Sequence, residues 1–349
     1  MALKVNIKKK YRDFLLDIKM MSTGRRIGIL GASGSGKSLT LKSIAGLIKP
    51  DEGTVEYDGR VLFDHRKRIN IRAEKRGAGY LFQNYALFPD MTVKGNINAA
   101  LHGAQKQGRL SKDRPRDTDE ILKGFGLFEI RDHMPAELSG GQKQRTALAR
   151  VLVTNPDLLL LDEPFSAIDM HLRERLRTEL IGMLDTYDKT VVFVSHDRDE
   201  IYQICDALIL IDNGKVIAQG KTYDLFEQPE TVSAARLTGC KNISRVIGVS
   251  KHRVKALDWN DIELVTDSVV TDDITHIGIR AHDFIPGMSG VNDIRCGVAS
   301  VSRLPFEWYI TLENGLWWKL ERKHYDGRQE INLPEYVSIS PERILLLKG

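Results

Sequence analysis

The stretch GASGSGKS at residues 31–38 most constrains what this chain can fold into. It matches the pattern G-x-x-x-x-G-K-[ST], follows the apolar run RRIGIL and continues into SLTLKSIAGLI, which has the apolar spacing of a helix. Glycine lacks a Cβ atom, so backbone N–H groups in such a loop can close around phosphate oxygens at the helix N-terminus. The sequence therefore predicts a strand, a phosphate-binding loop and a helix in succession.

Within this loop, the residue types predict particular contacts with a nucleotide. The Lys37 amine is expected to reach the β- and γ-phosphates, and the Ser38 hydroxyl is a predicted ligand of Mg²⁺. The alternative, a chance glycine-rich turn, is disfavoured because a strand and a helix flank the loop. The residues expected to bind the nucleotide are Gly31, Ser33, Gly34, Ser35, Gly36, Lys37, Ser38 and Leu39.

Two adjacent carboxylates follow the run LLLL at residues 158–161. An apolar run this uniform is typical of a parallel strand buried on both faces. Asp162, at the end of that strand, is a predicted metal ligand beside the phosphate loop. Glu163 is the predicted general base that orients and deprotonates the attacking water. The alternative for Glu163 is a surface glutamate at a strand end, which its neighbourhood disfavours.

Gln83 and His196 each follow another apolar strand pattern, in GYLFQ and VVFVSH. We expect the Gln83 amide to contact both a water of the Mg²⁺ shell and the helical segment that follows, which makes it a candidate for the catalytic and the metal site. We expect His196 to contact the γ-phosphate. Alone, neither residue would indicate a site, since a single histidine is more often structural.

The middle of the chain predicts helices and a hairpin. Residues 94–137 are polar and charged with mostly helical spacing, which predicts an inserted helical subdomain at about residues 90–140. The stretch ALILIDNGKVIAQG predicts a hairpin with its turn at Asn213 and Gly214.

The end of the chain has a different sequence pattern. After Asn242, short β-type runs alternate with turns. The predicted fold class is an α/β P-loop nucleotide-binding domain with an inserted helical subdomain, followed by a small all-β domain like an OB or MOP barrel. The expected limits are residues 1–235 for the first domain and 243–349 for the second.

Composition narrows the functional classes. The chain has 349 residues and three cysteines, Cys205, Cys240 and Cys296, whose spacing indicates neither disulfide pairs nor a metal site, so we expect a reducing compartment. No apolar run reaches the roughly eighteen residues of a membrane span, so any membrane contact is expected to come through a partner. The net charge of +4 gives little support to nucleic-acid binding, and the basic run at residues 65–76 is expected to be a solvated loop.

The stretch LSGGQ at residues 138–142 gives the other motifs their context. Taken in order, GASGSGKS, the glutamine after an apolar strand, LSGGQ, LDEP, SAID and SH resemble the motif set of the ATP-binding-cassette (ABC) ATPases across residues 1–235. The resemblance implies ATP and Mg²⁺ as cofactors. It also implies a head-to-tail homodimer, in which residues of one subunit contact the γ-phosphate of ATP on the other. These residues are Ser139, Gly140, Gly141 and Gln142.

Two further residues are assigned with alternatives. Asp169, in SAID, resembles the residue that couples the two sites of the ABC dimer, and it would equally cap the helix expected to begin near Met170. For adenine, the family uses an aromatic platform near the first strand. Tyr11 fits this resemblance, and Phe14 is the alternative.

Within the family, the segment YALFPDMTV and the β-rich tail resemble the importer branch. This implies integral-membrane permease subunits as partners, an extracytoplasmic solute-binding protein as an indirect partner, no nucleic acid, and a peripheral location at the cytoplasmic face of the cell membrane. The candidate permease contacts are Tyr85, Leu87, Phe88 and Pro89. The alternative for Phe88 is packing inside the helical subdomain.

The segment from Val61 to Ile97 most resembles the molybdate and tungstate importers. Import of sulfate, ferric iron, a polyamine or a sugar stays open, as does a soluble ABC ATPase outside transport. In the molybdate subgroup the tail can bind the oxyanion, and ordinary surface charge is the alternative for its basic residues. The candidate anion donors of the tail are Lys251, His252, Arg253 and Arg280.

Overall fold

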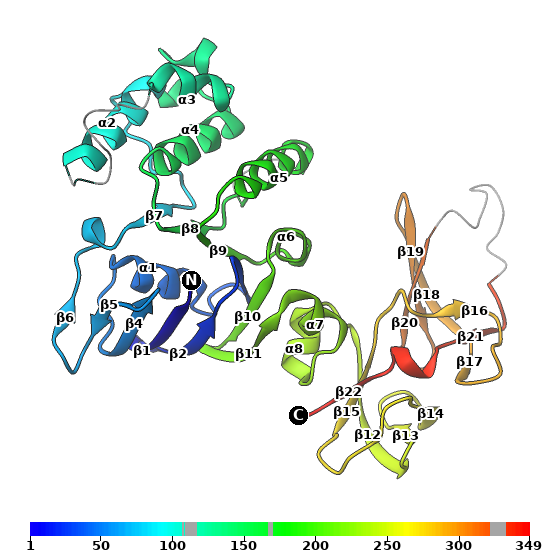
Figure 1. The fold of residues 1–349 in the computed structure, drawn as a ribbon. Coiled ribbons are helices and arrows are strands. Elements are labelled where there is room, and N and C mark those ends of the chain that lie inside the picture. The colour runs from blue at the N-terminus through cyan, green and yellow to red at the C-terminus, as the bar shows by residue number, and fades with distance from the viewer. Residues whose placement is uncertain (107, 109–116, 167–169, 322–332) are drawn as a thin grey trace. The chain divides into compact units, whose positions relative to one another are not determined.

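The computed structural model describes residues 1–349 except 107, 109–116, 167–169 and 322–332. The described residues form two compact units, Met1–Tyr223 and Asp224–Gly349, each with its own apolar core (Figure 1). The first unit is an α/β domain with a helical region, and the second consists mainly of antiparallel sheets, which confirms the predicted fold class. None of the helices in the described part of the chain is long and apolar enough to cross a membrane.

A mixed sheet runs through the first unit, and its described strands are ordered β6-β5-β4-β1-β2-β11-β10-β3-β9-β8-β7. The strands from β10 to β7 are parallel neighbours, and most of the other pairs are antiparallel. The parallel strands are β3 (Arg26–Leu30), β7 (Ala78–Leu81), β8 (Leu158–Asp162), β9 (Thr190–Ser195) and β10 (Ala207–Asp212). The others are β1 (Leu3–Tyr11), β2 (Phe14–Ser22), β4 (Glu52–Tyr57), β5 (Arg60–Asp64), β6 (Ile69–Asn70) and β11 (Lys215–Lys221).

The local sequence explains most of these strands. β8 and β9 are buried at every residue, as their uniform apolar runs require. Asn213 and Gly214 adopt φ angles of 45° and 76°, the two successive positive values of a type I′ turn, and join β10 to β11 as predicted. The β1–β2 hairpin gave no comparable signal, because lysines occupy the exposed face of β1.

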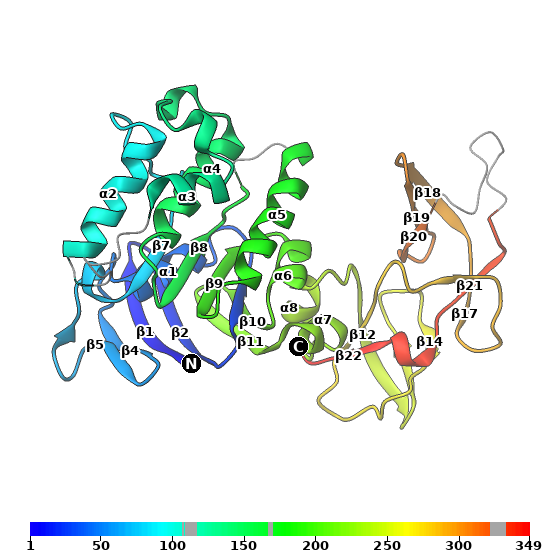
Figure 2. The ribbon, with the colours of Figure 1, turned by 45° about the horizontal axis from the view of Figure 1, so that its top comes forward.

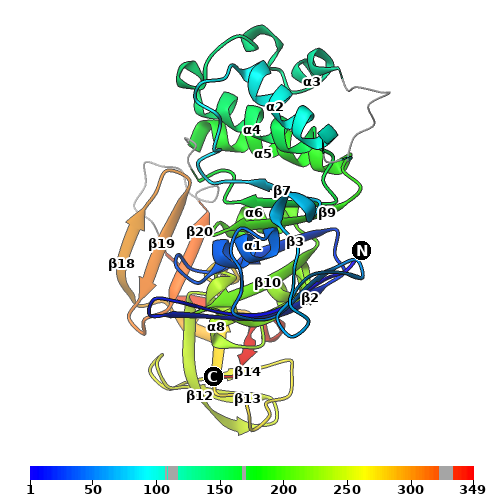
Figure 3. The same cartoon turned by 90° about the vertical axis from the view of Figure 1, so that its left-hand side faces the viewer.

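The helix after the phosphate loop, α1 (Lys37–Ala45), lies inside the curve of the sheet (Figure 3). It contacts β7, β8 and β9 on one side and β2 on the other. Leu41 and Ile44 are fully buried in the core that both parts of the sheet share. The sheet therefore holds the phosphate loop from two directions.

The predicted helical subdomain contains α2 (Val93–Lys106), α3 (Thr118–Gly124) and α4 (Gly140–Leu152), which lie together in Figure 2. These helices share a separate apolar core that includes Val93, Ile97, Leu101, Leu122, Leu127, Leu138 and Ala149. Two more helices follow, α5 (Met170–Asp185) and α6 (Arg198–Ile204).

The second unit begins with short helices and continues as sheets. α7 (Thr222–Glu227) spans the division between the units, which falls ahead of residue 235 because α8 (Val232–Leu237) belongs to the second unit. The Val232 N–H donates to Lys348 O at 3.1 Å. The described strands of this unit are β12 (Asn242–Ser250), β13 (Arg253–Ala256), β14 (Ile262–Val265), β15 (His276–Ile279), β16 (Ile285–Pro286), β17 (Asp293–Arg295), β18 (Val298–Arg303), β19 (Glu307–Leu312), β20 (Trp317–Glu321), β21 (Tyr336–Ser338) and β22 (Leu345–Leu347).

The basic run at residues 65–76 is not wholly a solvated loop. Arg76 is only 2% exposed, and its guanidinium donates to Ser43 O at 2.9 Å, Ile44 O at 2.7 Å and Ile71 O at 2.8 Å. Two of these carbonyls belong to the last turn of α1, where carbonyl groups have no partner within the helix. The prediction was therefore wrong for Arg76, which caps the helix that follows the phosphate loop.

Candidate functional site

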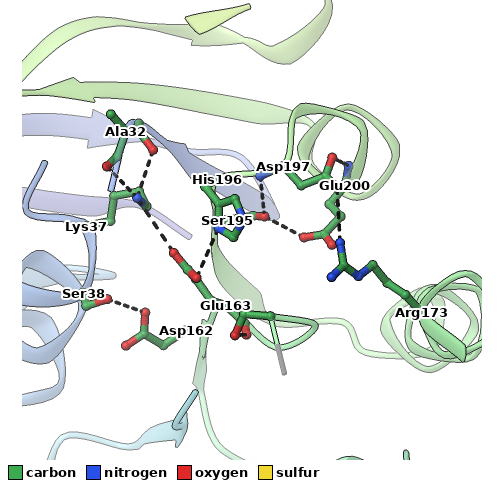
Figure 4. Close-up of polar contacts among 12 residues, drawn as sticks. Ala32, Lys37, Ser38, Asp162, Glu163, Arg173, Ser195, His196, Asp197 and Glu200 are labelled. Carbon is green, nitrogen blue, oxygen red and sulfur yellow. Dashed lines mark hydrogen bonds and ion pairs between the residues drawn. The ribbon is translucent and has the colours of Figure 1, made fainter. Parts of the chain in front are cut away.

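The predicted site residues converge at one edge of the parallel part of the sheet. β3, β9, β8 and β7 are parallel neighbours, and their last paired residues lie nearly level. The carboxyl ends of parallel strands meet at the same edge. The residues that leave this edge side by side are Gln83, Glu163, His196 and the loop beginning at Gly31; Figure 4 draws most of this group.

The phosphate loop needs glycine at two positions. Gly36 stands at the N-terminus of α1 with a φ of 104°, and a Cβ there would lie 2.6 Å from Leu16 Cδ1. A Cβ at Gly31 would lie 2.2 Å from Ile211 O. Gly34 also has a positive φ, 78°, but faces open space. The loop thus keeps a tight backbone path that other residues could not adopt without displacing their neighbours.

The side chains of the loop differ in their exposure. Ser33 is exposed and Leu39 is half-buried against the core. Ser35 is 4% exposed, and its hydroxyl has no hydrogen-bond partner among the residues that the structure describes. A buried hydroxyl without a partner is unusual in a folded protein, and here it lies in the loop expected to receive phosphate oxygens.

Lys37 is folded back onto this loop (Figure 4). Its Nζ donates to Gly31 O and Ala32 O, both at 2.9 Å, and lies 3.9 Å from Glu163 Oε1. Burial lowers the pKa of Lys37, while the carboxylates of Glu163 and Asp162 act in the opposite direction. The ammonium is therefore held beside the space that the loop surrounds.

Asp162 accepts two hydrogen bonds from hydroxyls. Ser38 Oγ donates to Oδ1 at 2.7 Å, and the Tyr80 hydroxyl donates to Oδ2 at 2.6 Å. The carboxyl group is nearly buried, at 4% exposure. Burial, and then the contact with Asp162, raise the pKa of Tyr80 above its ordinary value. Sequence reasoning missed Tyr80, because a tyrosine in a strand carries no spacing signal.

An unusual backbone turn orients the Glu163 side chain. Its φ of 45° lies in the left-handed region, which few residues other than glycine and asparagine adopt. The turn is fixed because the Glu163 N–H donates to Val194 O at 3.0 Å. The carboxylate then lies between Lys37 and His196, whose Nδ1 is 3.2 Å from Glu163 Oε2. The predicted base and the predicted histidine are therefore in direct contact.

A polar group behind His196 was also missed by sequence reasoning. Ser195 Oγ donates to Glu200 Oε2 at 2.6 Å and accepts from the Asp197 N–H at 2.9 Å. Glu200 is 3% exposed, and burial raises the pKa of its carboxyl. These contacts hold the turn that presents His196.

Gln83 lies in the turn after β7 and is exposed. It forms no hydrogen bond with any residue that the structure describes, and its contact with a metal-bound water stays a prediction. Asp169 lies outside the described residues.

The LSGGQ motif forms the start of α4. Ser139 Oγ accepts from the Gln142 N–H at 3.4 Å, and Gln142 Oε1 accepts from the Ser139 N–H at 2.8 Å, which makes a reciprocal cap. Ser139 and Gly140 are exposed, whereas Gly141 is buried. No hydrogen bond or ion pair within the described residues joins this motif to the phosphate loop. The helix therefore offers its N-terminal donors to solvent, away from the loop of its own chain.

The two aromatic candidates for adenine have different surroundings. Tyr11, at the end of β1, is 49% exposed. Phe14 packs against the core, and its ring would lie 3.2 Å from a Cβ at Gly36. Because Phe14 packs beside Gly36 of the loop, the geometry favours Tyr11, whose ring is half exposed, as the platform.

The candidate permease contacts differ in their exposure to solvent. Phe88 is 47% exposed, whereas Tyr85 is 6% exposed and Leu87 is half-buried against the helical core. Phe88 borders an apolar groove of about 540 Å³ between β7, α2 and α4, which we call the α2 groove. Its main lining residues are Ala78, Gly79, Tyr80, Phe82, Ala86, Phe88, Ala99, Ala100, Gly103, Ala104, Arg150 and Val151.

The four candidate anion donors of the tail lie at opposite ends of one strand. Arg280 follows β15 and donates to Thr238 O at 2.9 Å and to Phe226 O. Lys251 and His252 form the turn at the far end of β12, and Arg253 follows it; the nine residues of β12 extend roughly 30 Å. β12 therefore separates Arg280 from the other three residues, and their role as anion donors stays a prediction.

Comparison with known proteins relates this geometry to a family. The family described as ABC transporter matches residues 17–166. The chain is 36% identical over 252 residues to the molybdenum import ATP-binding protein ModC of Paramagnetospirillum magneticum, covering 72% of this chain and 67% of that protein. It is 38% identical over 242 residues to the probable sulfate/thiosulfate import ATP-binding protein CysA of Chlorella vulgaris, covering 68% of this chain and 98% of that protein.

An iron importer and a solved structure are similar to the same part of the chain. The Fe(3+) ions import ATP-binding protein FbpC of Haemophilus influenzae is 37% identical over 219 residues, covering 63% of this chain and 61% of that protein. The solved structure, described as the dimeric post-hydrolysis state of the ATP-binding cassette MJ0796 bound to ADP and Pi, aligns with a TM-score of 0.52 at 30% identity. That alignment covers 64% of this chain and 99% of the solved chain.

Proposed function

The chain belongs to the ABC transporter family as the ATPase subunit of an importer, and on this premise we propose that it drives uptake of an oxyanion, molybdate or tungstate, from a head-to-tail dimer. The observation that carries the catalytic part of the proposal is the contact of Glu163 with both Lys37 and His196 beside the phosphate loop.

Glu163 is the proposed general base. A water beside its carboxylate attacks the γ-phosphorus of ATP, the bond from that phosphorus to the β–γ bridging oxygen breaks, and Glu163 takes the water's proton. Lys37, which now donates to two loop carbonyls, would exchange them for phosphate oxygens. His196 contacts Glu163 Oε2 and fixes the carboxylate on the side opposite Lys37. This arrangement supports phosphoryl transfer to water.

The residues present fit Mg²⁺. The Ser38 hydroxyl and the Asp162 carboxylate are adjacent hard oxygen donors, which Mg²⁺ prefers, and it commonly takes only one or two protein ligands besides substrate phosphates. Ser38 and Asp162 would hold the ion, with Gln83 beside its water shell. When bound, the ion neutralises charge on the β- and γ-phosphates.

The dimer is proposed from the position of LSGGQ. The exposed N-terminal donors of α4, Ser139 and Gly140, have the chemistry of an anion site but lack contact with the phosphate loop of their own chain. In a two-fold dimer they would reach the γ-phosphate held by the partner. The dimeric solved cassette supports this arrangement.

Coupling to a permease is proposed to occur at the α2 groove. Phe88 is the exposed aromatic at its border, and the groove is lined mainly by apolar residues, as a contact site for a partner protein would be. The integral-membrane permease is the proposed occupant, which would place the chain at the cytoplasmic face of the membrane.

The solute is proposed from sequence resemblance. Similar proteins include importers named for molybdenum, sulfate/thiosulfate and Fe(3+), at 36%, 38% and 37% identity. Residues 61–97 favour molybdate and tungstate among these.

Uptake in cells tests the solute. Cells whose only copy carries Glu163→Gln are given labelled molybdate, tungstate, sulfate and ferric iron, with Glu174→Gln, an exposed glutamate, as the control. We expect selective loss of molybdate and tungstate uptake in Glu163→Gln cells. Selective loss of sulfate or iron uptake would contradict the oxyanion assignment that we favour and leave the ATPase assignment standing.

A further inference from the structure

Tyr80 lies between the metal carboxylate and the α2 groove. Its hydroxyl donates to Asp162 Oδ2 at 2.6 Å, while the residue also lines the groove. The register explains the first contact: Tyr80 pairs with Leu160 in the parallel β7–β8 ladder, and Asp162 is two residues further along β8, on the same face. Tyr80 therefore belongs both to the proposed metal site, through Asp162, and to the α2 groove, where the permease is proposed to bind.

The Asp162 carboxylate has little freedom to turn. Ser38 Oγ donates to Oδ1 at 2.7 Å and Tyr80 donates to Oδ2, so each oxygen already has a hydroxyl partner. Ser38 is a proposed metal ligand, and its hydroxyl contact must rearrange when the ion binds. The Tyr80 contact uses the other carboxylate oxygen. It can therefore persist and keep the carboxylate in a single orientation.

Tyr80 packs partly against the core of the first unit and lines the α2 groove beside Phe82. Its ring lies 4.5 Å from the Phe82 ring, centroid to centroid, at a tilt of 51°. Across the groove, α2 presents only small residues, Ala99, Ala100, Gly103 and Ala104. A side chain entering the groove would come against Tyr80 and Phe82, and any displacement of the Tyr80 ring would displace its hydroxyl.

We propose that Tyr80 is a positioning residue for Asp162 and that it transmits occupancy of the α2 groove to the metal carboxylate. The proposal rests on the proposed role of Asp162 as a metal ligand. Outer partners that orient a ligating carboxylate typically change metal affinity by about 10–100-fold when they are removed.

The first test measures the metal's contribution to nucleotide binding without turnover. The Kd of a fluorescent, non-hydrolysable ATP analogue is measured on the full chain in EDTA and in saturating Mg²⁺. The Kd in EDTA divided by the Kd in Mg²⁺ is the metal ratio. We expect Tyr80→Phe to reduce the metal ratio at least about threefold. The matched control is Tyr85→Phe, which removes a buried hydroxyl that has no partner within the described part of the chain, and we expect the parental ratio. A Tyr80→Phe ratio equal to the parent's would overturn the proposal.

Asp162→Asn separates this inference from the proposed function. If Asp162→Asn retains the parental metal ratio, the metal role of Asp162 is wrong and the inference fails with it. If Asp162→Asn reduces the ratio and Tyr80→Phe does not, only the role of Tyr80 is wrong.

The groove is tested with Gly103→Leu. A Cβ at Gly103 meets no atom within 4 Å, and its backbone φ is not in the left-handed region, so a side chain can be introduced there at the lining of the groove. We expect the metal ratio to change at least about twofold in the parent and to stay constant in the Tyr80→Phe background. The same change in both backgrounds, or no change in the parent, would overturn transmission through Tyr80. If Tyr80→Phe does not fold, the effect of Gly103→Leu in the otherwise parental chain still tests the proposal.

Discussion

Glu163 combines a strained backbone with a functional side chain. Its left-handed conformation directs the carboxylate between an amine and an imidazole, so the position needs both the turn and the acid. Replacing the acid alone should leave the turn intact, because the turn depends on the Glu163 N–H and Val194 O.

We expect Glu163→Gln to lower the ATP hydrolysis rate about 100-fold or more and to retain ATP binding, because an amide cannot accept the proton of the attacking water. Phosphate release and nucleotide affinity measure the two effects, with Glu174→Gln as an exposed control. Hydrolysis at the parental rate would remove Glu163 from the role of base.

The buried carboxyl of Glu200 predicts a pH effect on stability. Because burial raises its pKa in the folded state, the folded protein binds the proton more tightly than the unfolded chain. This contribution to stability is complete below the ordinary pKa of 4.5 and is lost as pH rises through the raised folded value. We expect Glu200→Gln, which cannot ionise, to show a Tm that increases relative to the parent between pH 5 and pH 8. A Tm difference that is constant across this range would contradict the argument.

At the scale of elements, the end of α1 depends on one buried guanidinium. Arg76 donates to the carbonyls of Ser43 and Ile44, and Gly46, with a φ of 81°, leaves room for it. We expect Arg76→Met to lower the free energy of unfolding by about 2–4 kcal/mol, because it removes the buried donor shared by the carbonyls of Ser43, Ile44 and Ile71. Urea denaturation measures the loss, and the exposed Arg72→Met should stay near the parent.

The loop after β7 carries the proposed permease contact. We expect Phe88→Asp to keep basal ATP hydrolysis and to abolish solute uptake, because a charge replaces the exposed ring at the border of the groove. Hydrolysis and uptake are compared in membrane vesicles that contain the assembled transporter. Phe306→Asp, at a position 85% exposed in the second unit, serves as a matched control. Parental uptake in Phe88→Asp vesicles would contradict the contact.

Sequence reasoning found the elements with strong local signals. The glycine pattern, the four leucines before Asp162 and the Asn213–Gly214 turn each report a local constraint, and the structure contains the corresponding loop, strand and hairpin. The burial of Arg76 and the contact of Tyr80 with Asp162 depend on residues 32 to 82 positions away. Such contacts follow from strand order and packing, which residue spacing does not report. The catalytic roles of the assembled residues stay predictions.

At the scale of the whole molecule, the proposed dimer makes two sites that each need both chains. We expect Lys37→Ala and Ser139→Arg to be inactive separately, because each homodimer has the same defect in both sites. Mixing equal amounts should restore about one quarter of the parental ATPase activity, since half of random dimers are mixed and each has one intact site. Activity is measured before and after mixing. No recovery on mixing, with both chains folded and able to exchange partners, would argue against a shared site.

The strand order also determines when each strand can pair while the chain is being synthesised on the ribosome. β3, which leads into the phosphate loop, pairs with β9 and β10, so it must wait from residue 30 until residue 190 has been made. At about 5–20 residues per second, that delay is roughly 10–30 seconds. β1, β2 and β4 can pair with one another meanwhile. The half of the sheet made first can thus form a platform, while the loop that binds ATP is among the last parts to acquire its neighbours.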